Sequence, residues 1–155
     1  MFFFWLLAAP SFGVDIAISP LNERHYGDFC PDHLGTSIVF LGSAGCGSSN
    51  FALIPLSPFV TGRTITSLTV CYRTEFNPGS YSTGVKLELL ESLEPGVDVS
   101  LWSDAVVRLA DPAVCEVIPM SVTPKGSPVL KISTEQYAAA GENTYIGQIW
   151  ISVTK

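Results

Sequence analysis

Residues 64–73 (TITSLTVCYR) have the pattern that decides the fold of this chain. In an extended segment Leu68, Val70 and Tyr72 share one face, and the residues between them share the other. Residues 83–91 (TGVKLELLE) alternate in the same way after a Pro-Gly turn, and such alternation is typical of half-buried strands. The two stretches therefore predict strands with one face against a core.

Similar short apolar stretches recur along the chain at intervals of about 8–15 residues, separated by Pro and Gly turns. This spacing predicts an all-β protein whose residues 14–155 form one antiparallel β-sandwich of jelly-roll type. Polar residues 21–35 are expected to form a long loop, and one short helix is expected at 133–140, where Ser133 and Gln136 can form a capping box. The further expected strands are residues 14–19, 36–41, 51–56, 97–102, 105–109, 114–118, 129–132 and 144–154.

The same alternation places two tryptophans, Trp102 and Trp150, on the outer surface of the sandwich. Ile146 would share the outer face with Trp150, unless that last strand is central and buried on both sides. An exposed tryptophan ring can stack on a sugar ring or fill a pocket of a partner. The residues expected to face the core are Val97, Val99 and Leu101 in one strand, and Tyr145, Ile149, Ile151 and Val153 in the other.

The chain is poor in charge and acidic. Only 14% of its 155 residues are charged, and the formal net charge is −6, whereas charged residues make up about 25% of an average soluble protein. The eight Lys and Arg residues are scattered singly along the sequence, so no basic stripe that would neutralise phosphates is visible, and a nucleic-acid partner is not expected.

The N-terminus begins with an unbroken apolar run, residues 2–9 (FFFWLLAA). The run is too short to span a bilayer, which needs about 20 apolar residues. Residues 1–13 are therefore expected to be either a secretory signal peptide or a retained segment that packs against its own domain or a neighbour. The protein is accordingly expected to be secreted or at the cell surface.

Four cysteines in a chain that looks exported predict disulfides. The favoured pairs are Cys30 with Cys46, which flank one loop-rich segment, and Cys71 with Cys115, which lie in expected strands. Free buried thiols are one alternative. A zinc site that uses Cys30, His33 and Cys46 is another, but the second ligand pair at finger-like spacing is missing, so no metal or cofactor is expected.

Candidate catalytic groups are few. His25, Asp28, Asp32 and His33 lie in one polar segment, and no G-x-S-x-G sequence is present. Carboxylates such as Glu88 are available for glycoside cleavage but are expected to be solvated. A hydrolase that uses His25 or His33 is therefore only a remote reading, and the chain is expected not to be an enzyme.

These features favour a non-enzymatic extracellular structural module that self-associates into a filament, surface layer or adhesive assembly. The expected joint is addition of the apolar N-terminal segment to the open sheet edge of a neighbouring copy. The alternative is a carbohydrate-binding, lectin-like module that uses Trp102 or Trp150 as its stacking platform. The residues assigned to the joint are Phe2, Phe3, Phe4, Trp5, Leu6, Leu7, Val14, Ile16 and Ile18.

Overall fold

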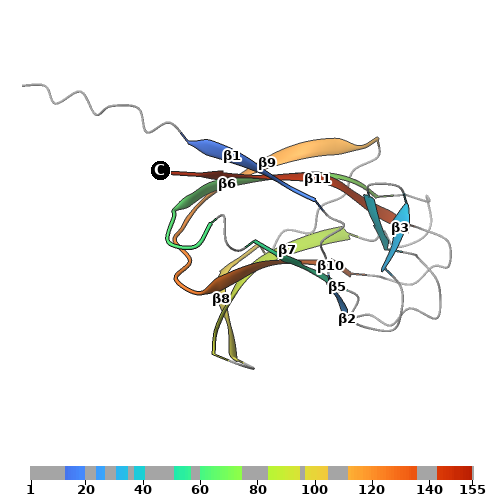
Figure 1. The fold of residues 1–155 in the computed structure, drawn as a ribbon. Coiled ribbons are helices and arrows are strands. Elements are labelled where there is room, and N and C mark those ends of the chain that lie inside the picture. Colours follow the sequence, from blue (N-terminus) through green and yellow to red (C-terminus); the bar gives the residue numbers. More distant parts are fainter. Residues whose placement is uncertain are drawn as a thin grey trace, which may run out of the picture.

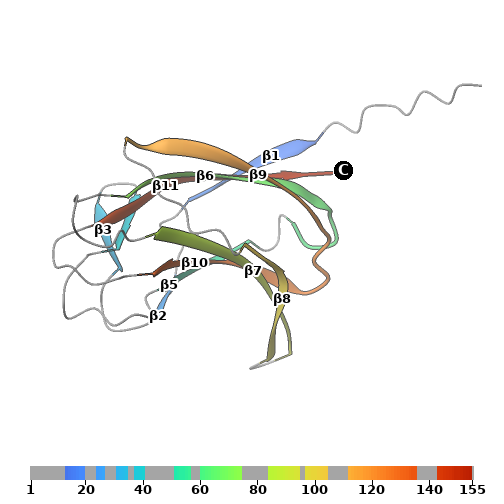
Figure 2. The same cartoon turned by 180° about the vertical axis from the view of Figure 1, so that it is seen from behind.

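A computed structural model describes residues 13–19, 24–26, 31–34, 37–40, 51–56, 60–74, 84–94, 97–104, 112–135 and 143–154. These residues form two antiparallel sheets that face each other, as Figures 1 and 2 show from opposite sides. Sheet A has the strand order β3-β4-β11-β6-β9, with β1 also paired to β11, and sheet B has the order β2-β5-β10-β7-β8. The prediction of an antiparallel β-sandwich is confirmed.

The strands are short in the first third of the chain and longer afterwards. Their bounds are β1 Val14–Ile18, β2 Arg24–Tyr26, β3 Pro31–Leu34, β4 Ser37–Phe40, β5 Phe51–Pro55, β6 Ile65–Thr74, β7 Gly84–Glu94, β8 Val97–Ser103, β9 Val114–Val122, β10 Ser127–Glu135 and β11 Thr144–Val153.

The core lies between the sheets and is built from the alternating apolar residues of the longer strands. On β6 the buried residues include Leu68, Val70 and Tyr72, as the alternation predicts. From the opposite sheet, Leu87 on β7 and Leu130 on β10 are 1% exposed. Burial of such side chains removes apolar surface from water, which is the main favourable term in folding.

Strand β1 belongs to the chain's own sheet. Val14 lies opposite Val153 and Ile18 lies opposite Ile149, so the strand pairs antiparallel with β11 over its whole length. Ile18 is in the core, and Val14 and Ile16 pack against it. These three residues were expected to join a neighbouring copy, but they complete their own sandwich instead. The other residues assigned to the joint, 2–7, lie outside the described residues.

Three expectations about secondary structure differ from the structure or fall outside it. Residues 21–35 were expected to be a loop, but they contain β2 and β3, whose three and four residues are too short to show a periodic pattern. Ser133 was expected to cap a helix, but it lies in β10 opposite Phe51 and Lys86. Residues 136–140 and 105–109 lie outside the described residues.

Irregular strand pairing corrects the expected direction of several side chains. On β11 the register shifts between Ile146 and Ile149, so Ile146 is fully buried while Tyr145 is only half-buried, the reverse of the expected order. Between β7 and β8 the register shifts after Leu89, which lies opposite Trp102. Because an inserted residue reverses the alternation beyond it, Trp102 packs against the core rather than facing outward.

The hairpin of β7 and β8 leaves the body of the sandwich. Both views show β7 bending away from sheet A toward its end, so that the end of β7 and the start of β8 project beyond sheet B (Figures 1 and 2). The two register shifts in this pair, at Leu89/Leu90 and Ser92/Glu94, are the local cause of the bend, because bulges bend and twist a strand.

No helix among the described residues is long and apolar enough to cross a membrane.

Candidate functional site

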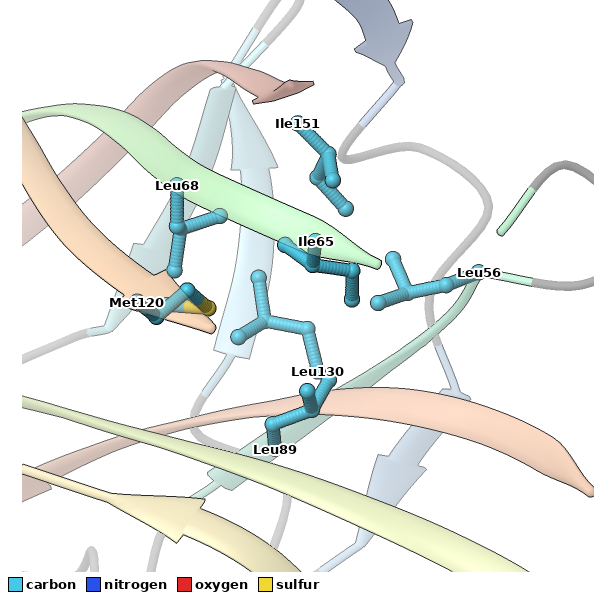
Figure 3. Close-up of a pocket in the computed structure, with 7 residues that line it drawn as sticks. All are labelled: Leu56, Ile65, Leu68, Leu89, Met120, Leu130 and Ile151. Carbon is cyan, nitrogen blue, oxygen red and sulfur yellow. The ribbon is translucent and has the colours of Figure 1, made fainter. Parts of the chain in front are cut away.

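Among the described residues, a small cavity lies in the core between the two sheets (Figure 3). Every side chain that lines it is apolar, so it offers no group for hydrogen bonding or catalysis. Among the described residues, the outer faces of the two sheets remain as candidate surfaces. The lining residues are Leu56, Ile65, Leu68, Leu89, Met120, Leu130 and Ile151.

The outer face of sheet B combines apolar, hydroxyl and charged side chains in two adjacent rows. We call this surface the Lys131 face. In the first row Leu53, Lys131, Glu88 and Ser103 lie opposite one another across four strands. In the second row Phe51 lies opposite Ser133, which lies opposite Lys86. The backbone register extends these rows to Arg24 and Tyr26 on β2.

Lys131 connects the charged and the aromatic parts of this face. Its Nζ atom lies 3.4 Å from Oε2 of Glu88 and 5.1 Å from the centroid of the Phe51 ring. The Lys131 and Glu88 side chains are 31% and 28% exposed, so both are partly desolvated yet accessible. An ammonium group has three donors, and these two contacts leave it able to donate to a ligand.

The bent hairpin lies beside the Lys131 face. β8 is the edge strand of sheet B next to β7, and the hairpin projects on the side of sheet B away from sheet A (Figures 1 and 2). Ser100 and Ser103 on β8 lie opposite Leu90 and Glu88 and are exposed. Ligand sites combine apolar side chains with a few polar groups, and this face has such a mixture.

The outer face of sheet A has a different aromatic surface, around Trp150. This half-buried residue lies opposite Ala17 on one side and Thr69 on the other. Thr69 in turn lies opposite Val117, which is 63% exposed. Its chain neighbours Ile149 and Ile151 are buried in the core, so the structure keeps Trp150, unlike Trp102, on an outer face.

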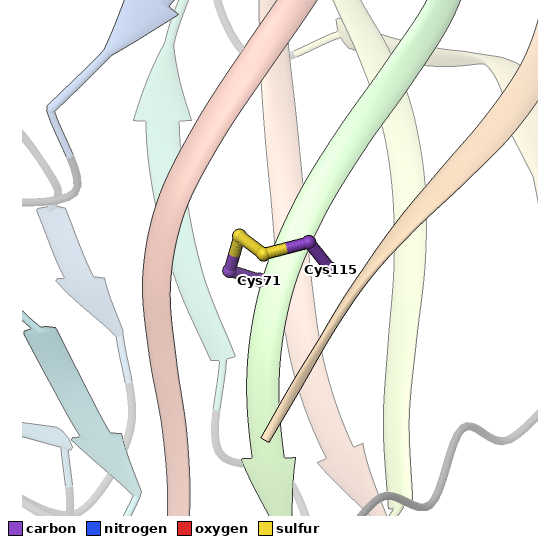
Figure 4. Close-up of a disulfide and its surroundings, with 2 residues drawn as sticks. All are labelled: Cys71 and Cys115. Atoms are coloured by element: carbon purple, nitrogen blue, oxygen red, sulfur yellow. A yellow bond between two sulfur atoms is a disulfide. The ribbon is translucent and has the colours of Figure 1, made fainter.

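Two further contacts cover the same side of sheet A. The guanidinium carbon of Arg73 lies 5.8 Å from the centroid of the Tyr145 ring. Cys71 and Cys115, directly opposite each other on β6 and β9, form a disulfide (Figure 4). This predicted pair is confirmed, whereas Cys30 and Cys46 lie outside the described residues.

The structure separates the two histidines that the sequence groups together. His25 lies on β2 opposite Ala52 in sheet B, and His33 lies on β3 opposite Ile38 in sheet A. Asp32 is on β3 as well, and Asp28 lies outside the described residues. Among the residues that the structure describes, no three His, Cys, Asp or Glu side chains gather as metal ligands.

Sequence reasoning missed the Lys131 face. Glu88 was expected to be solvated, and Phe51 and Lys131 were assigned only to strands. The alternation along the strands did place these residues on outer faces. The outward positions of their strands are residues 51, 53, 86, 88, 131 and 133. What the sequence could not show is which strands are neighbours and in what register.

No protein-family model matches the chain, and no curated protein matches it. Solved β-sandwich structures do match. The CBM22-1 xylan-binding domain of Xyn10C from Paenibacillus barcinonensis is similar at a TM-score of 0.65 and 15% identity, over 95% of this chain and 99% of the other.

Two further structures resemble the chain over most of its length. A mutant of a family 29 carbohydrate-binding module, in complex with mannohexaose, has a TM-score of 0.56 and 14% identity, over 91% of this chain and 92% of its own. The low-affinity xylan-binding module CBM86 from Roseburia intestinalis has a TM-score of 0.55 and 12% identity, over 92% and 97%. At these identities the likeness shows a shared fold.

These comparisons correct the main functional reading of the sequence. A self-associating filament or surface-layer subunit was expected, but the structural neighbours are carbohydrate-binding modules. The structure gives a physical reason against the filament as well, because the strand expected to enter a neighbour's sheet already pairs with β11 of its own chain.

Proposed function

We propose that this protein is a non-catalytic carbohydrate-binding domain that acts outside the cell, and that the Lys131 face is its main binding surface. The observation that carries the proposal is the contact of Lys131 with both Phe51 and Glu88 in the middle of an outer sheet face. The similarity to xylan- and mannohexaose-binding modules supports the same function.

The chemistry of this face suits a sugar chain. A sugar ring has C–H groups that pack on apolar and aromatic side chains such as Phe51 and Leu53, and hydroxyl groups that both donate and accept hydrogen bonds. Lys131 supplies donors, Glu88 supplies acceptors, and Ser133 supplies a hydroxyl that does either. The rows run across four strands, so the surface is long enough to contact several sugar units.

Two observations support a binding role without catalysis and an extracellular location. The carboxylate of Glu88 on this face is already engaged by Lys131. Glu91, three residues further along β7, is buried on the opposite side with backbone partners. The described side chains of this face therefore include no pair of carboxylates placed across a scissile bond. The Cys71–Cys115 disulfide is typical of proteins in oxidising compartments.

The proposal is tested by the variants Phe51→Ala and Lys131→Ala. Binding is measured by calorimetry and affinity electrophoresis against soluble xylan, mannan, polygalacturonate and alginate. Each variant is expected to weaken binding of the best glycan by about tenfold or more, because truncation of a central contact costs more than about 1.4 kcal/mol. Far-ultraviolet circular dichroism checks that both variants remain folded, which is expected because both residues are on the surface.

The Trp150 surface is the second candidate for the same function. It is favoured by the half-buried indole ring between Ala17 and Thr69, since flat aromatic rings are good partners for sugar rings. Trp150→Ala is the matched test, and we expect it to change binding by less than about twofold. If Trp150→Ala abolishes binding and Phe51→Ala does not, the binding surface is on sheet A and the assignment to the Lys131 face is wrong.

A further inference from the structure

Met120 differs from the other residues that line the cavity of Figure 3. The six others are buried, and none of them is more than 3% exposed. Met120 is half-buried, and it belongs to β9, which is an edge of sheet A among the described strands. Figure 3 shows its sulfur atom directed toward the cavity. This side chain therefore connects the apolar interior with the surface of the protein.

Strand β9 is irregular where Met120 lies. The register with β6 shifts between Pro119 and Val122, where β9 has two residues, one of them Met120, opposite a single residue of β6. Such a bulge disrupts the ladder of hydrogen bonds locally. Pro119, directly before it, has no N–H group to donate. The pairing that holds β9 to its sheet is therefore interrupted beside Met120.

A disulfide holds the other half of the same strand. Cys115, nearer the start of β9, is bonded to Cys71, which lies directly opposite on β6. The start of β9 is thus attached to its neighbour by a covalent bond as well as by pairing. A change at Met120 is expected to act on the second half of the strand and to leave the first half in place.

The thioether of a half-buried methionine can be oxidised. A peroxide transfers one oxygen atom to the sulfur and converts the side chain to a polar sulfoxide. The sulfur lone pair forms the S–O bond, the O–O bond breaks, and hydrogen peroxide is reduced to water as the sulfur is oxidised. The cavity has no hydrogen-bond donor for the new oxygen, because every side chain that lines it is apolar.

From these observations we infer that Met120 is a site of reversible oxidation by peroxides, and that its sulfoxide loosens the second half of β9. The oxidised side chain leaves the cavity to reach water, so that Leu68 and Leu89 lose a packing partner. Reduction of the sulfoxide restores the apolar side chain and its packing. The inference does not depend on glycan binding, so either proposal can fail while the other stands.

The test compares the full-length wild type with Met120→Leu, each before and after treatment with hydrogen peroxide. Peptide mapping by mass spectrometry locates the added oxygen, and thermal unfolding measures its effect. We expect Met120 to be oxidised in the folded wild type and the Tm to fall by about 4 °C or more, because a polar group replaces an apolar one in the core. Methionine sulfoxide reductases are expected to restore the Tm.

Met120→Leu is the matched control. It keeps an apolar side chain of similar volume, so it is expected to fold and to keep its Tm in peroxide. It also retains Met1, the other methionine of the chain, and thereby controls for oxidation elsewhere. Hydrogen exchange of the oxidised wild type adds a position to the effect, and it is expected to become faster at residues 120–122 and to stay unchanged at residues 115–117.

Four outcomes would overturn the inference. If Met120 stays unmodified until urea unfolds the chain, the oxidant does not reach its sulfur in the folded protein. If Met120 is oxidised without a change in Tm, the sulfoxide is accommodated and β9 is not loosened. If Met120→Leu loses as much stability in peroxide as the wild type, the effect arises at another residue. Faster exchange over the whole of β9 would contradict the restriction to its second half.

Discussion

Glu91 shows how a single residue of this protein combines charge and burial. Its side chain is on the inner side of β7 and only 4% of it is exposed. Oε1 accepts hydrogen bonds from the backbone N–H groups of Lys125 and Gly126 in the turn between β9 and β10. The buried carboxylate therefore satisfies two donors of a turn that joins sheet A to sheet B, and it has a structural rather than a catalytic role.

We predict that Glu91→Ala lowers the free energy of unfolding by about 2–4 kcal/mol. Two backbone donors lose their acceptor, and an unsatisfied buried donor costs about 1–3 kcal/mol. Glu91→Gln keeps one oxygen acceptor and is expected to lose less than Glu91→Ala. Urea denaturation followed by fluorescence measures both. Equal stability of wild type and Glu91→Ala would mean that the turn finds other acceptors.

At the scale of the strand, the disulfide fixes the edge of sheet A. β9 is the last strand of that sheet, and Cys115 on β9 is bonded to Cys71 on β6, which lies 44 residues earlier in the chain. Figure 4 shows the bond between these two strands. The link closes a long loop that contains β7 and β8, so it constrains the unfolded chain more than the folded one.

The double variant Cys71→Ala/Cys115→Ala is expected to lose about 2–4 kcal/mol of stability through the gain of unfolded-chain entropy. Thermal and urea unfolding of the variant and the wild type, both without reductant, measure the difference. Glycan binding at 25 °C is expected to be retained, because the disulfide is on sheet A and the Lys131 face is on sheet B. Loss of binding in a folded double variant would place the site near β6 and β9.

At the scale of the whole molecule, stability depends on the core that joins the two sheets. Leu130 on β10 is 1% exposed and lines the small apolar cavity together with Leu68 and Ile151 from sheet A, as Figure 3 shows. No described strand belongs to both sheets, so this layer of side chains is a main link that holds them face to face.

Leu130→Ala is expected to destabilise the protein by about 2–5 kcal/mol, since it removes buried apolar groups and enlarges a space that is already incompletely filled. Leu130→Met keeps the side-chain volume and is expected to cost less than about 1.5 kcal/mol. Chemical denaturation of both variants gives the comparison. Similar losses for Ala and Met would show that side-chain shape at this position matters more than its volume.

The sequence predicts the class of fold from local patterns, because alternation along a strand depends only on neighbours in the chain. Leu68, Val70 and Tyr72 are buried as expected, and the pairing of Cys71 with Cys115 follows from their positions in two expected strands. The same local rule fails at Trp102 and Tyr145, because bulges in the β7–β8 pair and in β11 shift the alternation by one residue.

The sequence by itself therefore determined an acidic, charge-poor antiparallel sandwich, because composition and residue periodicity are properties of the chain. Only the tertiary structure decided where its few charges gather. Lys86 and Lys131 are far apart in the sequence, yet strands β7 and β10 bring them into two adjacent rows of one face. Strand order and register determine that gathering, and both are set by long-range pairing that no local pattern contains.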